Sequence, residues 1–235
     1  MINPKLKALA EKIQDRKLQG KVVELLENPT FEIDGKKHSG LPLEVSPAGL
    51  SNHHCYPGGY IEHVVSTANI ALAICNSIEK VYHGKVNRDL VITGVLLHDI
   101  FKPITYATNE GGGYSSTHLA DFMDHLSLVT AELVRRGFPL DVVHVVSAHH
   151  GNYGPIRPHT VEALVCHLAD LTDSRLDGEI LNAARYIARR AGSGELFGLT
   201  SKEAFEIIDS KSRESWEGVA RAAENIRRRR NTHKA

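Results

Sequence analysis

The segment Leu96-Leu97-His98-Asp99-Ile100-Phe101-Lys102 carries the main clue to the architecture of this chain. It ends a stretch, 88–99, that is apolar almost all round, which predicts a helix at the centre of the fold. A polar pair at the end of such a helix needs an internal partner, because burying it unpaired costs kilocalories per mole. A divalent metal would supply that partner, since neutral imidazole and carboxylate are both common ligands. For this pair alone, a hydrogen bond between His98 and Asp99 is the simpler interpretation.

Helical periodicity extends outward from this segment in both directions. Asn3-Pro4 provides a cap and a first-turn proline for the first helix. Glycines and prolines interrupt the pattern from 28 to 59, where one short hairpin is expected around Asp34-Gly35. A loop carries Gly111-Gly112-Gly113, and no convincing series of strands is present. The fold class is therefore predicted to be all-α, with helices at about 4–26, 60–82, 88–99, 116–136, 139–150, 160–175, 177–191 and 201–230.

Length and composition limit the classes of protein that fit. The 235 residues are 42% hydrophobic and 24% charged, which predicts one globular domain, or one domain with an appendage, and excludes a disordered chain. The net charge of zero argues against a protein that coats nucleic acid over its whole surface. Three cysteines without paired spacing predict neither a disulfide framework nor a thiolate zinc site. No apolar run reaches about 18 residues and no signal peptide is evident, so we expect a cytoplasmic protein without membrane contact.

Histidine is the exception in this ordinary composition. Of the 14 histidines, 12 lie between His53 and His167. Five predicted helices each bring a histidine or an aspartate to an apolar face, and packing alone does not explain that number. We therefore expect a metal centre in the core of a helical bundle, built by facing helices. The residues concerned are His63, His98-Asp99, His125, His149-His150 and the pair His167 and Asp170.

The ordered set His63, His98-Asp99 and Asp170 resembles the H…HD…D signature of the HD-domain superfamily of metal-dependent phosphohydrolases. The flanking sequence is similar to the HD domain of bacterial 3′→5′ exoribonucleases, and the resemblance covers about residues 50–180. Two features depart from those enzymes. About 50 residues precede the region, too few for an OB-type nucleic-acid-binding domain, and Phe101 replaces their usual glycine. The quoted segments are His53-His54-Cys55-Tyr56-Pro57-Gly58-Gly59-Tyr60-Ile61-Glu62-His63, Leu97-His98-Asp99-Ile100-Phe101-Lys102, Ser147-Ala148-His149-His150-Gly151 and His167-Leu168-Ala169-Asp170.

The resemblance implies an HD-domain helical bundle with one or two divalent transition metals in its core. It also suggests a division into an N-terminal helix and irregular segment (1–49), an HD phosphohydrolase domain (50–192) and a C-terminal helical extension with a basic end (193–235). Manganese, iron, nickel or cobalt would suit the histidine-rich ligands better than magnesium. By this resemblance one metal takes His63, His98, Asp99 and Asp170, and a second takes His125, His149 and His150 with Asp99 as the bridge.

Catalysis would then use metal-bound hydroxide, with Asp99 and Lys102 as the catalytic residues. Lys102 would hold a phosphate oxygen, although an exposed lysine at a helix end is an equally good interpretation. Arg175 is a weaker candidate for the same role. The remaining candidates for substrate binding are His54 and Tyr56 near the mouth of the site and Arg157 in a loop.

Three hypotheses of function remain. The leading one is a phosphohydrolase that cleaves a phosphoester of a nucleotide, cyclic nucleotide or oligonucleotide. The second is a di-iron oxygenase of the same superfamily, which shares the ligand set. The third is a non-catalytic, RNA-associated binding module that uses the basic end Arg227-Arg228-Arg229-Arg230, although a solvated terminus explains those arginines as well. The sequence makes no prediction of the oligomeric state.

Overall fold

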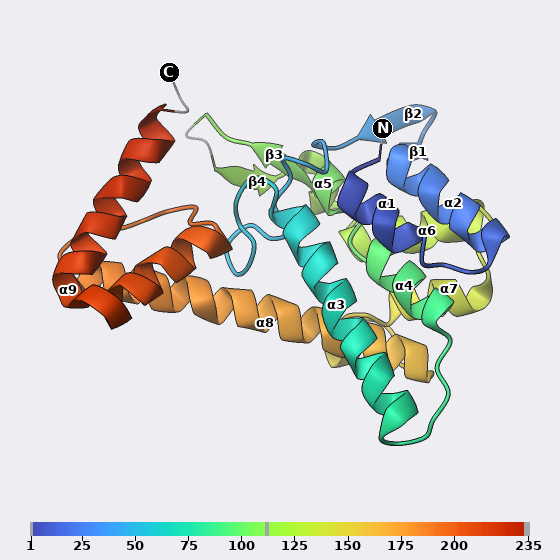
Figure 1. The fold of residues 1–235 in the computed structure, drawn as a ribbon. Helices are drawn as coiled ribbons and strands as arrows, with labels where there is room; N and C mark the ends of the chain where they lie inside the picture. The colour runs from blue at the N-terminus through green and yellow to red at the C-terminus, as the bar shows by residue number, and fades with distance from the viewer. Residues whose placement is uncertain (1, 111–112, 233–235) are drawn as a thin grey trace.

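The computed structural model describes residues 2–110 and 113–232, and most of them are helical (Figure 1). The strands of the described residues form two short antiparallel hairpins, and helices make up the rest of the regular structure. The all-α prediction is therefore confirmed. The hairpins are β1 (Thr30–Ile33) with β2 (Lys36–Ser39), as expected around Asp34-Gly35, and β3 (Tyr106–Thr108) with β4 (Tyr114–Ser116). The helices are α1 (Pro4–Ala10), α2 (Arg16–Glu27), α3 (Gly59–Lys80), α4 (Arg88–Leu97), α5 (Lys102–Thr105), η1 (His118–Asp121), α6 (His125–Arg135), α7 (Leu140–Ser147), η2 (Gly151–Tyr153), α8 (Val161–Arg190) and α9 (Ser201–Thr232).

Helix α4 lies at the centre of the bundle, as its apolar sequence predicts. Seven consecutive residues, 91–97, are buried, and the helix contacts α1, α2, α3, α7 and α8. Asn87 begins it by accepting the backbone N–H groups of Asp89 and Leu90. A Cβ at Gly94 would lie 2.3 Å from a Val145 methyl, so this glycine permits the close approach of α7. The tight packing holds the C-terminal end of α4, and with it His98 and Asp99, inside the protein.

Helix α8 runs along the molecule and joins its two parts (Figure 1). It is one continuous helix of 30 residues, so the prediction of two helices separated near Gly178 is wrong. Gly178 serves a different purpose, because a Cβ there would lie 3.1 Å from the carbonyl oxygen of Asn52. The glycine therefore lets the loop before α3 rest directly on α8.

Two clusters of buried apolar side chains stabilise the fold. The larger includes Leu6 and Val22 from the N-terminal segment together with α3, α4, α6, α7 and the first half of α8. The smaller joins the second half of α8, including Leu181, to α9, and it also takes in Tyr56. The N-terminal segment thus shares the core of the bundle, while the C-terminal helix packs on its own cluster. The division at 49 and 192 stays a prediction.

Two of the expected helices are shorter and broken. The stretch 4–26 contains two helices, because Asp15 caps a new one by accepting the backbone N–H groups of Lys17 and Leu18. The stretch 116–136 also differs: η1 precedes α6, which begins after its N-cap Asp124. His118 therefore lies on a separate exposed turn and not on one helix face with His125. Gly111 and Gly112 of the expected glycine loop fall outside the described residues.

Length and hydropathy alone would allow one described helix, α3, to span a membrane. Its best 18-residue window has a mean hydropathy of 1.2. In the structure α3 packs against α1, α4 and α8 and carries the buried His63. Its apolar character is therefore that of a central helix in the bundle.

Candidate metal centre

Four side chains from three parts of the chain converge at the end of α4. His63 comes from α3, His98 and Asp99 follow α4, and Asp170 comes from α8. The Nε2 atom of His63 lies 3.1 Å from Nε2 of His98 and 3.3 Å from both Asp99 Oδ2 and Asp170 Oδ1. One ligand atom from each of the four lies within 4.8 Å of all the others. Such a group could hold a single metal ion.

A second group lies on the other side of Asp99. The imidazoles of His125, His149 and His150 also offer ligand atoms within 4.8 Å of one another. Nε2 of His125 is 3.3 Å, and Nε2 of His149 is 3.8 Å, from Asp99 Oδ1. Asp99 therefore presents Oδ2 to the first group and Oδ1 to the second.

Local backbone contacts fix the tautomers of two of these histidines. His98 donates from Nδ1 to the carbonyl of Val95 at 2.8 Å, and His149 donates from Nδ1 to the carbonyl of Val146 at 2.7 Å. Each contact spans three residues at a helix end, where the last carbonyls lack the usual partner four residues on. In a neutral ring the other nitrogen, Nε2, then carries a free lone pair. In both rings Nε2 faces Asp99, at 3.4 Å from Oδ2 for His98 and 3.8 Å from Oδ1 for His149.

The buried polar atoms of the cluster lack hydrogen-bond partners. Oδ1 of Asp99, Nε2 of His125 and Nε2 of His149 are inaccessible to solvent and make no hydrogen bond. Oδ2 of Asp99 is equally inaccessible and has ion-pair contacts, the shortest to Lys102. Unsatisfied buried acceptors are rare because each costs free energy. Imidazole nitrogens and carboxylate oxygens are also the donors that divalent transition metals prefer. The residues present therefore fit a metal centre, whose individual ligand assignments stay predictions.

The pKa values of the histidines are shifted in opposite directions in the two groups of ligand candidates. Burial lowers the pKa of His98, but the carboxylates of Asp99 and Asp170 outweigh it and raise that pKa to about 9. In the second group burial dominates and lowers the pKa of His125 to about 4. Burial likewise lowers the pKa of His149 well below its usual value. The first group thus attracts positive charge, and the second offers neutral imidazoles.

Lys102 lies at the edge of this cluster. Its ammonium is 2.5 Å from Asp99 Oδ2, and only 11% of its side chain is exposed. Burial lowers the pKa of Lys102, but Asp99 outweighs the effect and the net pKa is raised, so the side chain stays charged. Lys102 also lines a cavity of about 300 Å³ together with Tyr106, His53 and the loop 48–52. A charged donor beside Asp99 is therefore open to a ligand in this cavity.

Two further carboxylates of α8 follow Asp170 at helical spacing and support the centre from outside. After Asp170, Asp173 accepts a 2.7 Å hydrogen bond from Nδ1 of His63, which orients the ring of that histidine. Asp177 accepts the backbone N–H of His54 and the hydroxyl of Ser201. The sequence analysis missed Asp173 and Asp177. Their spacing from Asp170, which repeats one helix face, was the available signal.

The other expected substrate-binding residues lie away from the cavity. His54 and Tyr56 are buried, and Tyr56 donates its hydroxyl to Glu62 at 2.5 Å. Arg175 and Arg157 are exposed on α8 and on the loop before it, and neither lines the cavity of Lys102. His53, to which the sequence analysis gave no role, does line it, and burial lowers the pKa of His53 to about 3.

The basic end of the chain is largely engaged within the protein. Arg230 contacts Glu203 and the carbonyl oxygens of Phe197 and Gly198, and Arg229 contacts Glu206 at 2.6 Å. Arg227 donates to the carbonyl of Ser193. These contacts attach the last part of α9 to the preceding loop. Arg227 and Arg230 are thus held against the preceding loop, whereas Arg228 and Arg229 remain exposed.

Comparison with known proteins agrees with this geometry. The HD domain model matches residues 60–175. The chain is 38% identical over 206 residues to a dihydroneopterin 2′,3′-cyclic phosphate phosphodiesterase of Methanocaldococcus jannaschii, covering 88% of this chain and 82% of that protein.

Similarity to exoribonucleases is more limited in extent. The chain is 33% identical over 140 residues to the 3′-5′ exoribonuclease YhaM of Oceanobacillus iheyensis, covering 56% of this chain and 43% of that protein. The corresponding enzyme of Bacillus subtilis is 29% identical over 155 residues, and again the chain spans less than half of its length, 46%. No solved structure matches the chain. The chain therefore belongs to the HD-domain family of metal-dependent phosphohydrolases.

Proposed function

We propose that this phosphohydrolase cleaves the cyclic phosphodiester of a small, nucleotide-like compound at a centre that holds one or two divalent transition metals. The observation that carries the proposal is the position of Asp99. One of its oxygens faces His63 and His98, and the other faces His125 and His149. A carboxylate between two sets of imidazoles suits a bridge between two ions, the arrangement of many phosphoesterases.

A bound divalent metal would supply two effects, lowering the pKa of a water molecule towards about 7 and polarising a phosphoryl oxygen. Imidazole-rich donor sets favour manganese, iron, nickel or cobalt over magnesium, which prefers oxygen ligands. In this proposal the first position is held by His63, His98, Asp99 and Asp170, and the second by His125, His149 and His150 with Asp99.

The protein side chains have defined tasks in this proposal. Lys102 binds a non-bridging oxygen of the phosphate and balances the charge that develops there in the transition state. Asp99 keeps Lys102 ionised through their contact at 2.5 Å. Asp173 holds the ring of His63 in place through Nδ1. Catalytic geometry is thereby prepared before the substrate enters.

Three observations support a small substrate over RNA. The cavity beside Lys102 holds about 300 Å³, the lower end of the usual range for small-molecule sites. Similarity to the archaeal phosphodiesterase, named for a cyclic phosphate, extends over most of both chains. Arg227 and Arg230 contact carbonyl groups of their own chain, so they are not free to bind RNA. We accordingly propose that 50–192 is the catalytic unit and 193–235 a structural extension.

The test is a comparison of substrates on protein that has been stripped of metal and then loaded with manganese, iron, nickel or cobalt. We expect hydrolysis of dihydroneopterin 2′,3′-cyclic phosphate and of 2′,3′-cyclic AMP to a phosphomonoester, with slower cleavage of a single-stranded RNA. Asp99→Asn serves as the inactive control. Cleavage of RNA without turnover of either cyclic phosphate would favour an exoribonuclease. Oxygen uptake by the iron form without phosphoester cleavage would favour the oxygenase.

A further inference from the structure

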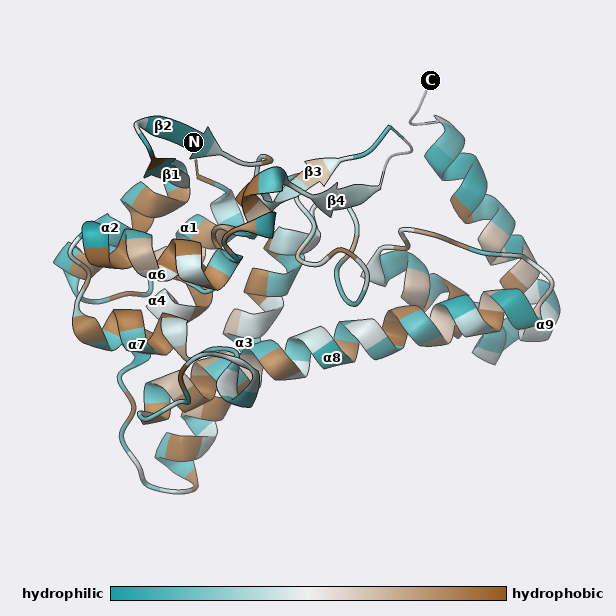
Figure 2. Cartoon of the chain, turned by 180° about the vertical axis from the view of Figure 1, so that it is seen from behind, coloured by the Kyte–Doolittle hydropathy of each residue, from teal (hydrophilic) through white to brown (hydrophobic). Residues whose placement is uncertain are grey.

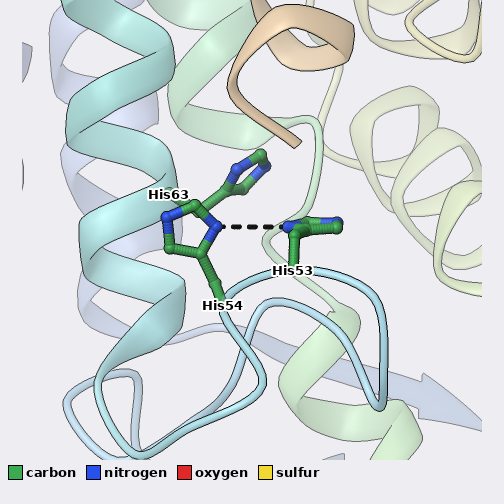
Figure 3. Close-up of side chains that lie close together, drawn as sticks. All are labelled: His53, His54 and His63. Atoms are coloured by element: carbon green, nitrogen blue, oxygen red, sulfur yellow. Dashed lines mark hydrogen bonds between the residues drawn. The ribbon is translucent and has the colours of Figure 1, made fainter. Parts of the chain in front are cut away.

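Two adjacent histidines in the loop before α3 face different surroundings (Figure 3). His54 is 3% exposed and has a left-handed backbone conformation with φ 44°. This turn brings both rings towards His63, with centroids 5.1 Å away for His53 and 5.5 Å away for His54. His53 lines the cavity that also contains Lys102 and Tyr106. One imidazole is thus internal, and its neighbour faces the space expected for the substrate.

The internal imidazole is surrounded by carboxylates of α8. Nδ1 of His54 lies 3.4 Å from Asp177 Oδ2 and 3.7 Å from Asp173 Oδ2. Asp177 also accepts the backbone N–H of His54 at 2.5 Å, which holds the loop against the helix. An ionised carboxylate only accepts hydrogen bonds. A proton on Nδ1 of His54 is therefore favoured by both neighbours.

The two imidazoles contact each other through the same type of atom. Nδ1 of His53 is 3.2 Å from Nδ1 of His54, as the dashed line in Figure 3 marks. Such a contact needs one donor and one acceptor. With the proton on His54, Nδ1 of His53 is the acceptor, and a neutral His53 then carries its proton on Nε2. Figure 3 shows this second nitrogen on the side of the ring away from His54.

The neighbouring loop passes close to that edge of His53. A Cβ added at Gly49 would lie 3.7 Å from Nε2 of His53 and 2.9 Å from its carbonyl oxygen. The missing side chain at Gly49 therefore permits this close approach. Both residues line the cavity of about 300 Å³ beside Lys102.

We propose that His53 is a substrate-binding residue whose Nε2–H donates to a non-bridging phosphate oxygen in the cavity beside Lys102. His54, Asp173 and Asp177 set the position of its proton. This inference rests on the proposed function, because it assigns the phosphate of the substrate to that cavity. His53 adds a neutral, directional donor to the charge of Lys102, so it contributes to binding and orientation of the phosphodiester.

The first experiment compares His53→Ala and His53→Gln as metal-loaded enzymes with 2′,3′-cyclic AMP. Loss of one hydrogen bond to an anionic oxygen should raise KM about 10- to 100-fold for His53→Ala, with a smaller change in kcat and unchanged metal content. His53→Gln should restore most of the loss, because its amide N–H lies near the position of Nε2. His118→Ala is the matched control on an exposed turn. An unchanged KM in His53→Ala, or loss of metal from that variant, would overturn the proposal.

The supporting chain is tested by Asp177→Asn in two backgrounds. Alone it should raise KM, because it weakens the preference for a proton on His54, whereas added to His53→Ala it should have no further effect. ¹⁵N NMR of the imidazoles in zinc-loaded protein reports the proton directly. We expect a protonated Nε2 and an unprotonated Nδ1 on His53, and the opposite assignment would contradict the proposal.

Failure of the proposed function would give a different pattern of results. In that case the wild-type enzyme would not hydrolyse 2′,3′-cyclic AMP at all. The NMR assignment still applies to that protein, as does calorimetric binding of inorganic phosphate. Weaker phosphate binding by His53→Ala, recovered in His53→Gln, would support the role of His53, and equal affinities would exclude it.

Discussion

The two halves of α8 pack against neighbouring helices but treat polar groups in opposite ways. The first half supplies Asp170 and Asp173 to a centre where Asp99 Oδ1 and Nε2 of His125 and His149 are buried without hydrogen-bond partners. The second half packs apolar side chains on α9, where the partly buried Glu203 is paired with Arg230. Figure 2 shows the same contrast, with the last turns of α9 largely hydrophilic. Unsatisfied buried atoms thus indicate where a ligand is needed, and saturated ones indicate where the fold is held together.

The largest effect is expected from Asp99→Asn, which tests the centre beside the first half of α8 directly. Loss of the carboxylate that we propose as the bridge should reduce phosphodiester hydrolysis by about 10³-fold or more and lower the metal content, because the negative charge in the centre depends on it. Elemental analysis and initial rates measure the two effects. Asp209→Asn, on the exposed surface of α9, is the matched control. Full activity in Asp99→Asn would refute the site assignment.

Lys102→Ala should separate catalysis from metal binding. We expect turnover to fall about 10²-fold, because one positioned charge beside the phosphate is removed, while the metal stays bound. The measurement is kcat together with metal content after gel filtration. Lys5→Ala on the exposed surface of α1 controls for the loss of a lysine. Loss of metal from Lys102→Ala would show that Lys102 maintains the metal centre and does not act on the phosphate alone.

Metal removal should destabilise the protein, because the groups around the first half of α8 would lose their ligand. A ligand present at about 100 times its Kd stabilises the folded state by about 2.7 kcal/mol, so chelation should lower Tm by several degrees. Thermal unfolding with and without a chelator measures this shift. In Asp99→Asn the chelator should change Tm little, since the site is already impaired. Equal chelator effects in both proteins would place the bound metal elsewhere.

The smallest effect is expected from Glu203→Gln on α9, the helix that packs against the second half of α8. Burial raises the pKa of Glu203, but its hydrogen bonds from Arg230 and Thr200 outweigh burial and lower it below the usual value of 4.5. A carboxyl whose pKa is depressed in the folded state stabilises the protein above its unfolded pKa and loses that effect as pH falls. Glu203→Gln should therefore lower the free energy of unfolding by about 1 kcal/mol at pH 7 and by less as pH falls below about 4.5.

The same variant should leave kcat/KM for the cyclic phosphate unchanged at pH 7, because Glu203 lies outside the cavity of Lys102. Chemical denaturation at several pH values measures the stability, and initial rates measure the activity. A large loss of activity with normal folding would show that the C-terminal extension acts on the catalytic centre.

Much of the fold was predictable where a local pattern fixes local structure. The central helix at 88–99 and the hairpin at Asp34-Gly35 are both present, because apolar periodicity and turn chemistry act within a few residues. The break at Asp15 and the continuity of α8 through Gly178 were not predicted. Both depend on contacts with distant parts of the chain: Asp89 binds the turn before Asp15, and Asn52 approaches Gly178.

The candidate site divides in the same way. Seven side chains selected from the sequence do converge in space, and their roles as ligands stay predictions. Their order along the chain and the energetic cost of a buried His98-Asp99 pair are properties of the sequence.

The tertiary structure decided the remaining features. It determines which oxygen of Asp99 faces which histidines. It also turns His54 inward while His53 faces the cavity, and it pairs Arg230 with groups of its own chain. The physical reason is that each of these depends on groups brought close by folding, across separations that no local pattern encodes.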